Sequence, residues 1–519
     1  MSSSGDIQIA KKYRFLFSVR SYVAVITCFC MATQYAQRLN MTIAIVCMVN
    51  HTGLKAMSNI SGNKSILHTD STHFKENYKN VQINNYIDTS DDYKYQENGA
   101  NIQRNISENP SNDHKDGPFL WDENMKGRLL SSYYFGYIVF QLSGGILAYK
   151  YGPRLILLLS MSAGTITTFL TPAAANISFT LVFTTRLLTG LSAGLVWPSL
   201  VELSSRWSPK DEKSVMLATA YSGAQIGPII YMPLYGSLCA MDFLNGWPLV
   251  FYAGGLMGII WCVACILTIT SNPDNNKFIS SNEKKYIKQN VILTVTGKQM
   301  DIPLKNIFTS VPCLIMFACY FLNCAGFYTI LSYVSTIMKD VFGFNIEKNG
   351  AATAIPYLFY FIMAISSGMV ADRLIRNKIL STQACRKCFT GIGNAGAAAA
   401  IFAMGYVNKN SPWVGVLMFT ITLASLGMNS GGLFIVPQDM SPKYAGIIWG
   451  IANTFGSIPG FVAPLIVGRI TKDSTREQWR IVFMLCAITH GLCALLFVIF
   501  GFSKLLPWSD SHKSSDDID

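Results

Sequence analysis

Two apolar runs are joined by Gly145-Ile146-Leu147-Ala148-Tyr149-Lys150-Tyr151-Gly152-Pro153-Arg154, and two later runs are joined by the related segment Gly368-Met369-Val370-Ala371-Asp372-Arg373-Leu374. The two segments lie six apolar runs apart, so the second part of the chain repeats the organisation of the first. We therefore predict two halves of six helices each. The candidate residues of these two loop motifs are Gly145, Gly152, Arg154, Gly368, Asp372 and Arg373.

The composition indicates an integral membrane protein. Of the 519 residues, 50% are hydrophobic and only 13% are charged, and the mean hydropathy is +0.31. This is too apolar for an ordinary soluble protein. The net charge of +12 does not indicate a nucleic-acid partner, because the lysines and arginines are scattered among loops instead of forming one basic face. We expect the chain to lie in a lipid bilayer and to bind no nucleic acid.

The apolar runs predict the number of membrane crossings, since about twenty apolar residues span a bilayer as a helix. Counting them predicts an all-α membrane protein with twelve transmembrane helices in two six-helix halves. The predicted spans are 21–49, 125–148, 154–175, 178–205, 214–240, 247–270, 310–338, 350–371, 386–406, 412–435, 444–468 and 480–502. The first run is too long for a signal-peptide core and follows several basic residues, so we expect it to be retained with a cytosolic N-terminus.

Two polar insertions set the predicted topology. Residues 50–124 follow an odd-numbered helix and carry N-glycosylation sequons at Asn50, Asn59, Asn63 and Asn105, so we place them outside the cytosol. Residues 271–308 are rich in lysine and follow an even-numbered helix, as expected of a cytosolic loop. The predicted parts are a cytosolic N-terminus 1–20, an N-terminal half 21–270 with the glycosylated loop 50–124, a cytosolic central loop 271–308, a C-terminal half 309–503 and a cytosolic acidic tail 504–519.

The cysteines indicate neither a disulfide framework nor a metal site. None of the 13 lies in the polar stretch 50–124, and nearly all lie in or beside apolar runs, so we expect them to pack between helices as small apolar side chains. Cys385 and Cys388 form a CxxC pair without a second pair to complete a zinc site. We expect no metal and no cofactor. The sequence also lacks a clustered nucleophile with an acid and a base, so we do not expect an enzyme.

Arg38 and Arg186 lie inside predicted spans, where an uncompensated arginine costs roughly 2.5 to 3.5 kcal/mol on insertion scales. Arg38 lies about 11 residues, or roughly 16 Å, before the outer end of its helix, and Arg186 follows the outer start of its own helix by a similar distance. Both therefore fall near the middle of a hydrocarbon core about 30 Å thick. We interpret them as a shared anion site, because a guanidinium can bind carboxylate or phosphate with two parallel hydrogen bonds. The alternative is a structural arginine that is buried against backbone carbonyls.

Other polar side chains lie at a similar depth. The further candidate substrate-binding residues are Tyr133, Tyr134, Tyr137, Asn323, Tyr328 and Asn453, although such tyrosines more often simply pack. Acidic residues are scarce within the spans: Glu202 and Asp439 each lie four residues before a basic residue, Arg206 and Lys443, and we expect them to form ion pairs. His490 is expected to pack. No carboxylate suited to a proton relay lies close to the two arginines.

Four stretches carry a resemblance to a known family. They are Tyr35-Ala36-Gln37-Arg38-Leu39-Asn40-Met41-Thr42-Ile43-Ala44-Ile45-Val46, Arg206-Trp207-Ser208-Pro209 with Glu212, Ser222-Gly223-Ala224-Gln225-Ile226-Gly227, and Asp439-Met440-Ser441-Pro442-Lys443-Tyr444-Ala445-Gly446. With the paired loop motifs, they resemble the anion transporter family of the major facilitator superfamily, which holds the type I sodium/phosphate cotransporters, sialin and the vesicular glutamate transporters. The resemblance runs from about Tyr22 to Trp508, without the glycosylated loop.

This resemblance implies alternating access and the transport of anions such as phosphate, glutamate, acidic sugars or urate. Arg38 and Arg186 match the family's anion-binding arginines. Ala193 and Thr189 stand where sialin has proton-linked glutamates, and Asn323 replaces an arginine of the glutamate transporters. These departures favour the phosphate and organic-anion branch, for which the resemblance implies Na⁺ as the coupling ion.

We therefore predict a secondary active transporter of inorganic phosphate or a small organic anion, linked to sodium symport, in the plasma membrane. Its expected partners are a small anionic solute, a coupling cation and the lipid bilayer. The alternative is a proton-coupled lysosomal or vesicular transporter of acidic sugars or amino acids, similar to sialin. A membrane sensor that binds the anion without moving it belongs to a different class, which uptake into vesicles would distinguish.

Overall fold

The computed structural model describes residues 18–50, 52–54, 117–141, 143–209, 212–290, 303–407, 410–442 and 444–509. The chain forms two units, residues 48–121 and the remainder. Of the predicted glycosylation sites, only Asn50 lies within the described residues, where its side chain accepts a hydrogen bond from the backbone amide three residues later at 2.6 Å. Asn59, Asn63 and Asn105 lie outside them.

The described part of the larger unit is helical. The first half consists of α1 (Val19–Met48), α5 (Glu123–Gln141), α6 (Ser143–Tyr151), α7 (Pro153–Ile177), α8 (Phe179–Gly194), α9 (Val196–Trp207), α10 (Lys213–Ala240), η3 (Phe243–Asn245) and α11 (Trp247–Thr268). The connection between the halves contains η4 (Pro273–Asn275), α12 (Ser281–Asn290) and α13 (Leu304–Thr309). The second half consists of α14 (Val311–Asp340), α15 (Ile346–Arg376), α16 (Thr382–Met404), α17 (Pro412–Gly427), η5 (Met428–Ser430), α18 (Val436–Met440), α19 (Ala445–Ile470) and α20 (Arg476–Phe500), followed by η6 (Pro507–Ser509).

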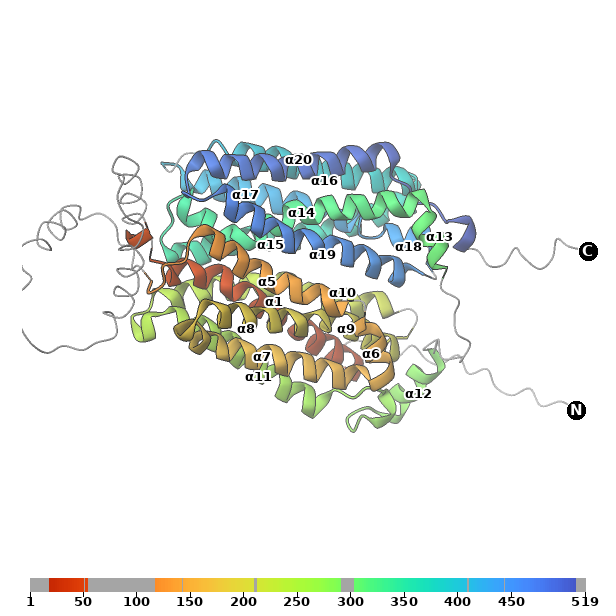
Figure 1. Cartoon of the computed structure of the whole chain (residues 1–519). Coiled ribbons are helices and arrows are strands. Elements are labelled where there is room, and N and C mark those ends of the chain that lie inside the picture. The colour runs from red at the N-terminus through yellow and green to blue at the C-terminus, as the bar shows by residue number, and fades with distance from the viewer. Residues whose placement is uncertain are drawn as a thin grey trace, which may run out of the picture. The chain divides into compact units, whose positions relative to one another are not determined.

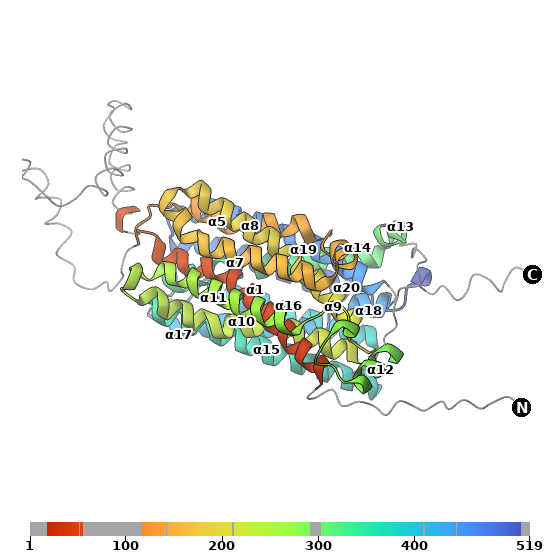
Figure 2. The same ribbon diagram turned by 90° about the horizontal axis from the view of Figure 1, so that it is seen from below.

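Each of the twelve predicted spans coincides with one helix or with two consecutive helices, which confirms the predicted all-α architecture. Figures 1 and 2 show the long helices running alongside one another in a bundle. In the first half α5 packs on α8 and α7 packs on α11, and in the second half α16 packs on α17 and α20. The two halves meet where α5 packs against α19 and α10 packs against α15.

Eight helices of the described residues are long and apolar enough to cross a membrane: α7, α8 with α9, α11, α14, α15, α17 with η5, α19 and α20. The four remaining long segments, α1, α5 with α6, α10 and α16, are less apolar. The α1 helix buries Gln34, Gln37, Arg38 and Asn40, each of which is at most 6% exposed. Such groups are tolerated at membrane depth only when they face protein or an aqueous cavity. The lower hydropathy of these segments therefore indicates helices whose polar faces point into the bundle.

Two glycines four residues apart on α8 bring helices into close contact. A Cβ atom at Gly190 would collide with the backbone oxygen of Tyr133, and one at Gly194 would meet the backbone oxygen of Tyr137 at 2.5 Å. These two glycines therefore let α8 lie directly against α5. Close packing of this kind replaces the hydrophobic drive that is missing between helices in lipid. It also fixes the position of the tyrosine-bearing face of α5.

The two halves are in closest contact near the outer end of the bundle, which is the end where α1 stops and α5 begins. Here a Cβ atom at Gly127 of α5 would collide with the backbone oxygen of Pro464 in α19, and one at Gly350 of α15 would collide with the backbone oxygen of Met232 in α10. In contrast, Gly450, near the opposite end of α19, has no atom within 4 Å of the place where its Cβ would lie. The halves are thus closed against each other on the predicted outer side.

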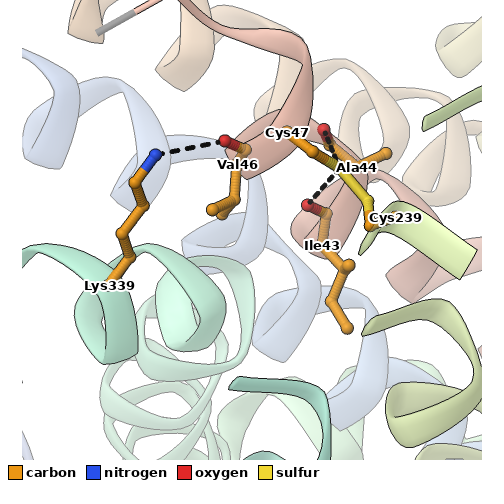
Figure 3. The surroundings of a disulfide bond; sticks show 6 residues. All are labelled: Ile43, Ala44, Val46, Cys47, Cys239 and Lys339. Carbon is orange, nitrogen blue, oxygen red and sulfur yellow. Dashed lines mark hydrogen bonds between the residues drawn. A yellow bond between two sulfur atoms is a disulfide. The ribbon is translucent and has the colours of Figure 1, made fainter. Parts of the chain in front are cut away.

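A disulfide bond corrects the prediction that all cysteines merely pack. Cys47 in the last turn of α1 is joined to Cys239 near the end of α10, with a Cα–Cα distance of 6.3 Å (Figure 3). Both helices run outward in the predicted topology, so both cysteines lie at the predicted non-cytosolic end, where disulfides persist. Beside the bond, Lys339 of α14 donates a hydrogen bond to the Val46 carbonyl at 3.4 Å, which links the two halves. The sequence signal was the position of each cysteine at the outer end of an odd-numbered helix.

The inner end of the first half is held by a buried ion cluster. The Arg20 side chain is fully buried, donates to Glu283 at 3.1 Å and also pairs with Glu212. Glu283 additionally accepts from the backbone amides of Val19 and Arg20, both at 3.2 Å, and so caps the start of α1. A carboxylate is favoured at a helix N-terminus. Since Glu283 belongs to α12, this cluster fastens the central connection to the first half.

One of the two predicted ion pairs is confirmed, because Arg206 donates to Glu202 at 2.8 Å, as its spacing predicts. Asp439 accepts from Arg386 of α16 at 2.8 Å, a pair that was not predicted. Its predicted partner Lys443 lies outside the described residues, so that pair stays a prediction. Arg386 also donates to the Gly431 carbonyl at 2.9 Å. The pair is long-range in sequence, so local spacing could not reveal it.

Candidate anion-binding site

A pocket lies between the two halves. Its walls come from α1, α5, α8, α9 and α10 of the first half and from α14 and α19 of the second half. The lining residues are Met31, Gln34, Tyr35, Arg38, Tyr137, Ala193, Val196, Trp197, Tyr221, Tyr320, Tyr328, Trp449 and Asn453. Among these described residues Arg38 carries the only charge, so the pocket has a net positive character.

Arg38 lies at the outer end of this pocket. The other lining residues of α1 precede it in the chain, and α1 runs outward, so they lie on its inner side. Met31 precedes Arg38 by seven residues, which corresponds to roughly 10 Å along a helix. With the closed glycine contacts on the outer side, the pocket extends from Arg38 toward the predicted cytosolic side.

The Arg38 guanidinium is surrounded by aromatic rings. It lies 4.7 Å from the ring centroid of Tyr134, 4.8 Å from that of Tyr328, 5.2 Å from that of Tyr35 and 5.7 Å from that of Tyr133. A cation over these faces is attracted by the ring quadrupoles. The side chain is 6% exposed, and its buried Nε atom has no hydrogen-bond partner. Within the described residues it forms no ion pair with a carboxylate, so its charge stays available for an anionic ligand.

Arg186 lies behind Arg38 and does not line the pocket. Its guanidinium donates to the backbone oxygens of Gln37 and Arg38, both at 3.1 Å, and to the side-chain oxygen of Asn40 at 2.9 Å. It also lies 5.5 Å from the Tyr133 ring centroid. This is the carbonyl-bound arrangement that was the alternative at the sequence level. In this conformation Arg186 fixes the segment of α1 that carries Arg38, while its buried Nε atom stays without a partner.

The tyrosines of α5 form the wall beside the guanidinium. Tyr133 accepts a hydrogen bond from Gln34 at 2.6 Å, and its ring stacks with that of Tyr137 at a centroid distance of 6.3 Å. Tyr134 packs against Tyr328 of the second half at 5.2 Å. Of the predicted tyrosines, Tyr137 and Tyr328 line the pocket, and Tyr133 and Tyr134 contact Arg38 from outside the lining set.

The two predicted asparagines of the second half occupy different places. Asn453 lines the pocket and accepts a hydrogen bond from the Tyr320 hydroxyl at 3.2 Å. Asn323 instead donates to Asn394 at 2.9 Å, and the same Asn394 oxygen lies 3.1 Å from His490 Nδ1. This buried polar cluster lies inside the second half, and none of its three members lines the pocket. The pocket geometry therefore does not support the prediction that Asn323 binds substrate.

Several pocket residues were missing from the sequence-based candidates. Tyr35 lies three residues from Arg38, and Gln34 four residues from it, so both share its helix face. Trp197, Tyr221, Tyr320 and Trp449 come from four different segments. What these four residues share in the sequence is an aromatic side chain on the inner half of a helix that lines the pocket. The pocket-lining face of such a helix is difficult to recognise from sequence when its lipid-facing side is also apolar.

The residues of the two repeated loop motifs lie at the inner end of the helix bundle. Gly152 adopts a φ of 93°, which disfavours residues with a Cβ, and so turns the chain between α6 and α7. Arg154 donates to the Ile266 carbonyl at 2.7 Å and ties α7 to α11. In the second copy, Asp372 and Arg373 are exposed. The first copy thus binds helices within one half.

The match to known proteins extends over most of the chain. The family model described as Major Facilitator Superfamily matches residues 27–464. The "Putative inorganic phosphate cotransporter" of Drosophila melanogaster is 31% identical over 501 residues, covering 95% of this chain and 87% of that protein. Human sialin is 33% identical over 396 residues, covering 76% of this chain and 79% of that protein. Vesicular glutamate transporter 1 of Xenopus tropicalis is 32% identical and covers 77% of this chain and 69% of that protein.

Solved structures agree on the fold. A D-xylose-proton symporter superposes with a TM-score of 0.64 at 13% identity and covers 95% of this chain and all of that one. A bacterial homologue of the lysosomal transporter Spinster, in an inward-facing and occupied conformation, gives a TM-score of 0.62 at 12% identity, with 92% and 96% coverage. The relatives are membrane transporters and not enzymes. The chain therefore belongs to the major facilitator superfamily and, within it, to the anion transporter family that includes inorganic phosphate cotransporters, sialin and the vesicular glutamate transporters.

Proposed function

We propose that this protein carries inorganic phosphate or a small organic anion across a membrane by sodium-linked symport, with Arg38 as the main anion-binding group. The anion would enter the pocket between the halves and neutralise Arg38. Closure of the inner side and opening of the outer side would then expose it to the other compartment. The proposal concerns the solute class, the coupling ion and the role of Arg38.

One observation carries this proposal: a buried guanidinium lies in an otherwise uncharged pocket between the two halves, without a carboxylate partner among the described residues. A buried charge that is uncompensated is costly, so a protein retains it where a ligand supplies the opposite charge. Tyr137 and Asn453 provide further hydrogen-bonding groups beside it. Arg186 supports the site by holding the α1 backbone on either side of Arg38.

The lining of the pocket supports Na⁺ as the proposed coupling ion. Ala193 forms part of its wall at the position where sialin has a proton-linked glutamate. Neither Ala193 nor Thr189 can bind a proton, and no described pocket residue is acidic. We therefore favour Na⁺ over H⁺ and the plasma membrane over lysosomes or vesicles. The competing function is a proton-coupled vesicular or lysosomal transporter of acidic sugars or amino acids.

Uptake into proteoliposomes tests the role of Arg38. We expect Arg38→Ala to abolish saturable uptake of labelled phosphate or organic anions. Arg38→Lys should retain weak uptake with a raised KM, because lysine keeps the charge but cannot donate the two parallel hydrogen bonds of a guanidinium. Arg480→Ala removes an arginine outside the pocket and serves as the matched control. Uptake by Arg38→Ala at the wild-type rate would refute the proposal.

The same vesicles distinguish the two coupling ions. We expect uptake to fall when external Na⁺ is replaced by choline and to persist when a protonophore abolishes the pH gradient. Uptake that requires an acid-outside gradient and ignores Na⁺ would instead support the proton-coupled alternative. Surface biotinylation of cells that express the protein tests the plasma membrane location.

A further inference from the structure

The connection between the halves contains an amphipathic helix, α12, which lies beside the start of α1 (Figure 2). Its residues Glu283, Tyr286 and Ile287 are buried. They are spaced three and four residues apart, so they share one helix face. Glu283 binds Arg20, whose guanidinium also lies 4.8 Å from the Tyr286 ring centroid. One face of α12 is thus fastened to the predicted cytosolic end of the first half.

The outward face of α12 and the turn before it are basic. Lys277, Lys285 and Lys288 are exposed, and Lys284 is partly exposed. The Asp274 carboxylate lies 3.1 Å from the Lys284 ammonium and 2.8 Å from that of Lys288, so it holds the two groups close together. Four lysines and one aspartate give this surface a net charge of +3. We call these five residues the lysine platform.

The lysine platform lies next to the inner end of a lipid-facing helix. At the end of α11, Ile266 and Leu267 are 55% and 66% exposed, as expected of side chains that face lipid. Asn276 donates to the Thr268 carbonyl at 2.9 Å and so brings the turn back to this helix end. The backbone amide of Phe278 donates to the Asn276 side-chain oxygen at 2.9 Å, and the Phe278 side chain is 67% exposed. An apolar ring beside basic residues at this level is favoured among lipid headgroups.

Acidic phospholipids match this surface in charge and in position. The cytosolic leaflet carries a negative surface potential, which attracts lysines that lie close to it. A small free anion would be held only weakly by exposed lysines, because salt screens their charge. A lipid headgroup is different, since its acyl chains keep it at the membrane surface, where the lysines and Phe278 lie together.

We propose that the lysine platform binds the headgroup of an acidic phospholipid of the cytosolic leaflet, with Phe278 inserted at the headgroup level. This inference depends on the predicted topology and is independent of the anion site at Arg38. Because Glu283 of the same helix caps the start of α1, the bound lipid holds the inner end of the first half at the membrane surface.

Lipid binding to the purified full chain tests the proposal. Native mass spectrometry would measure the Kd of the first bound phosphatidylserine and of the first bound phosphatidylcholine with the same acyl chains. We expect the wild type to bind phosphatidylserine at least about fivefold more tightly than phosphatidylcholine. The double variant Lys277→Gln with Lys285→Gln should lose most of this preference. Within the described residues neither lysine forms an ion pair, so the variant should fold normally.

A matched control makes the same change in charge at the opposite end of the bundle. Lys348→Gln with Lys472→Gln removes two exposed lysines at the predicted outer side and should keep the preference for phosphatidylserine. The proposal is wrong if the platform variant binds phosphatidylserine as tightly as the wild type does. It is also wrong if the control loses as much of the preference as the platform variant.

Access to water tests the position of Phe278 separately. Cys388 is exposed and would first be replaced by serine. Single cysteines at Phe278, Leu267 and Asn377 would then be labelled with a membrane-impermeant maleimide in nanodiscs that contain phosphatidylserine. Leu267 is the lipid-facing reference, and Asn377, which is exposed beyond the end of α15, is the aqueous reference. Phe278→Cys should react at least about fivefold more slowly than Asn377→Cys, and equal rates would contradict the proposal.

Discussion

Replacing Arg186 by alanine should destabilise the protein much more than replacing Arg38. The Arg186 side chain is 2% exposed and makes three hydrogen bonds to α1, at 3.1, 2.9 and 3.1 Å. Each hydrogen bond from a charged donor contributes roughly 1.5 to 3 kcal/mol, and the loss of Arg186 also removes the donor to the buried side-chain oxygen of Asn40. Because water can enter the vacated space and satisfy some acceptors, we expect a net loss of about 3 to 5 kcal/mol.

Arg38→Ala has no such consequence. Its guanidinium contacts four tyrosine rings, each contact contributing roughly 0.5 to 2 kcal/mol, and its removal also relieves the cost of an unpaired buried charge. These two effects oppose each other, so the net change in stability should be small. The two arginines thus differ in what they stabilise, although both lie at the same predicted depth.

Thermal unfolding of the purified variants in detergent measures this difference. We expect Arg186→Ala to lower the Tm by about 5 °C or more, Arg186→Lys to recover part of the loss, and Arg38→Ala to stay within about 2 °C of the wild type. If Arg186→Ala unfolds at the wild-type temperature and yet abolishes anion binding, Arg186 contacts the anion directly, and the positioning role that the contacts indicate is wrong.

Three further predictions concern the helix packing, the disulfide and the outer loop. Gly190→Ala should lower the Tm and the yield of folded protein, because the new Cβ collides with the Tyr133 backbone oxygen, whereas Gly491→Ala, with no atom within 4 Å, should have little effect; equal Tm values would contradict the tight α5–α8 contact. Reduction of the denatured protein should expose two additional thiols to a maleimide label, and Cys47→Ser should abolish that increase; an unchanged increase in Cys47→Ser would exclude the Cys47–Cys239 pairing. Glycosidase treatment should increase the electrophoretic mobility of protein from eukaryotic cells, and replacing Asn50, Asn59, Asn63 and Asn105 by glutamine should remove that shift; an unchanged mobility of the wild type would refute the glycosylated loop.

The helices could be predicted from the sequence because the signal is local and strong. Each span is a run of apolar residues, and the lipid environment demands that its backbone be satisfied within one helix. Glycine spacing is an equally local feature, since glycines four residues apart, such as Gly190 and Gly194, necessarily share a helix face. The depth of Arg38 followed from counting residues along α1.

The remaining features depend on how helices face one another, which sequence spacing does not specify. Arg386 and Asp439 are 53 residues apart, and Cys47 and Cys239 are separated by 192 residues. The rotation of each helix about its axis also decides that Trp197 and Trp449 face the pocket. In soluble proteins a polar outer surface reveals that rotation, but in lipid both faces are apolar and the contrast is lost.

Sequence spacing does not show which groups surround a side chain, and for this reason Arg38 and Arg186 were both predicted to bind the anion. Counting residues placed Arg186 at the depth of Arg38, but depth does not say which groups surround a side chain. The Gln37 and Arg38 carbonyls that bind Arg186 belong to backbone that is already hydrogen-bonded within a helix, so no sequence motif marks them as acceptors.

The central claim is that Arg38 holds the transported anion, and equilibrium binding of a labelled anion to the purified protein tests it most directly. Wild-type protein and Arg38→Gln would be compared in nanodiscs, since glutamine keeps a polar side chain of similar reach but has no charge. We predict saturable binding to the wild type and its loss, by at least about hundredfold in Kd, in Arg38→Gln at an unchanged Tm, as expected for removing the one charge that faces the ligand. An unchanged Kd in a folded Arg38→Gln protein would contradict the claim.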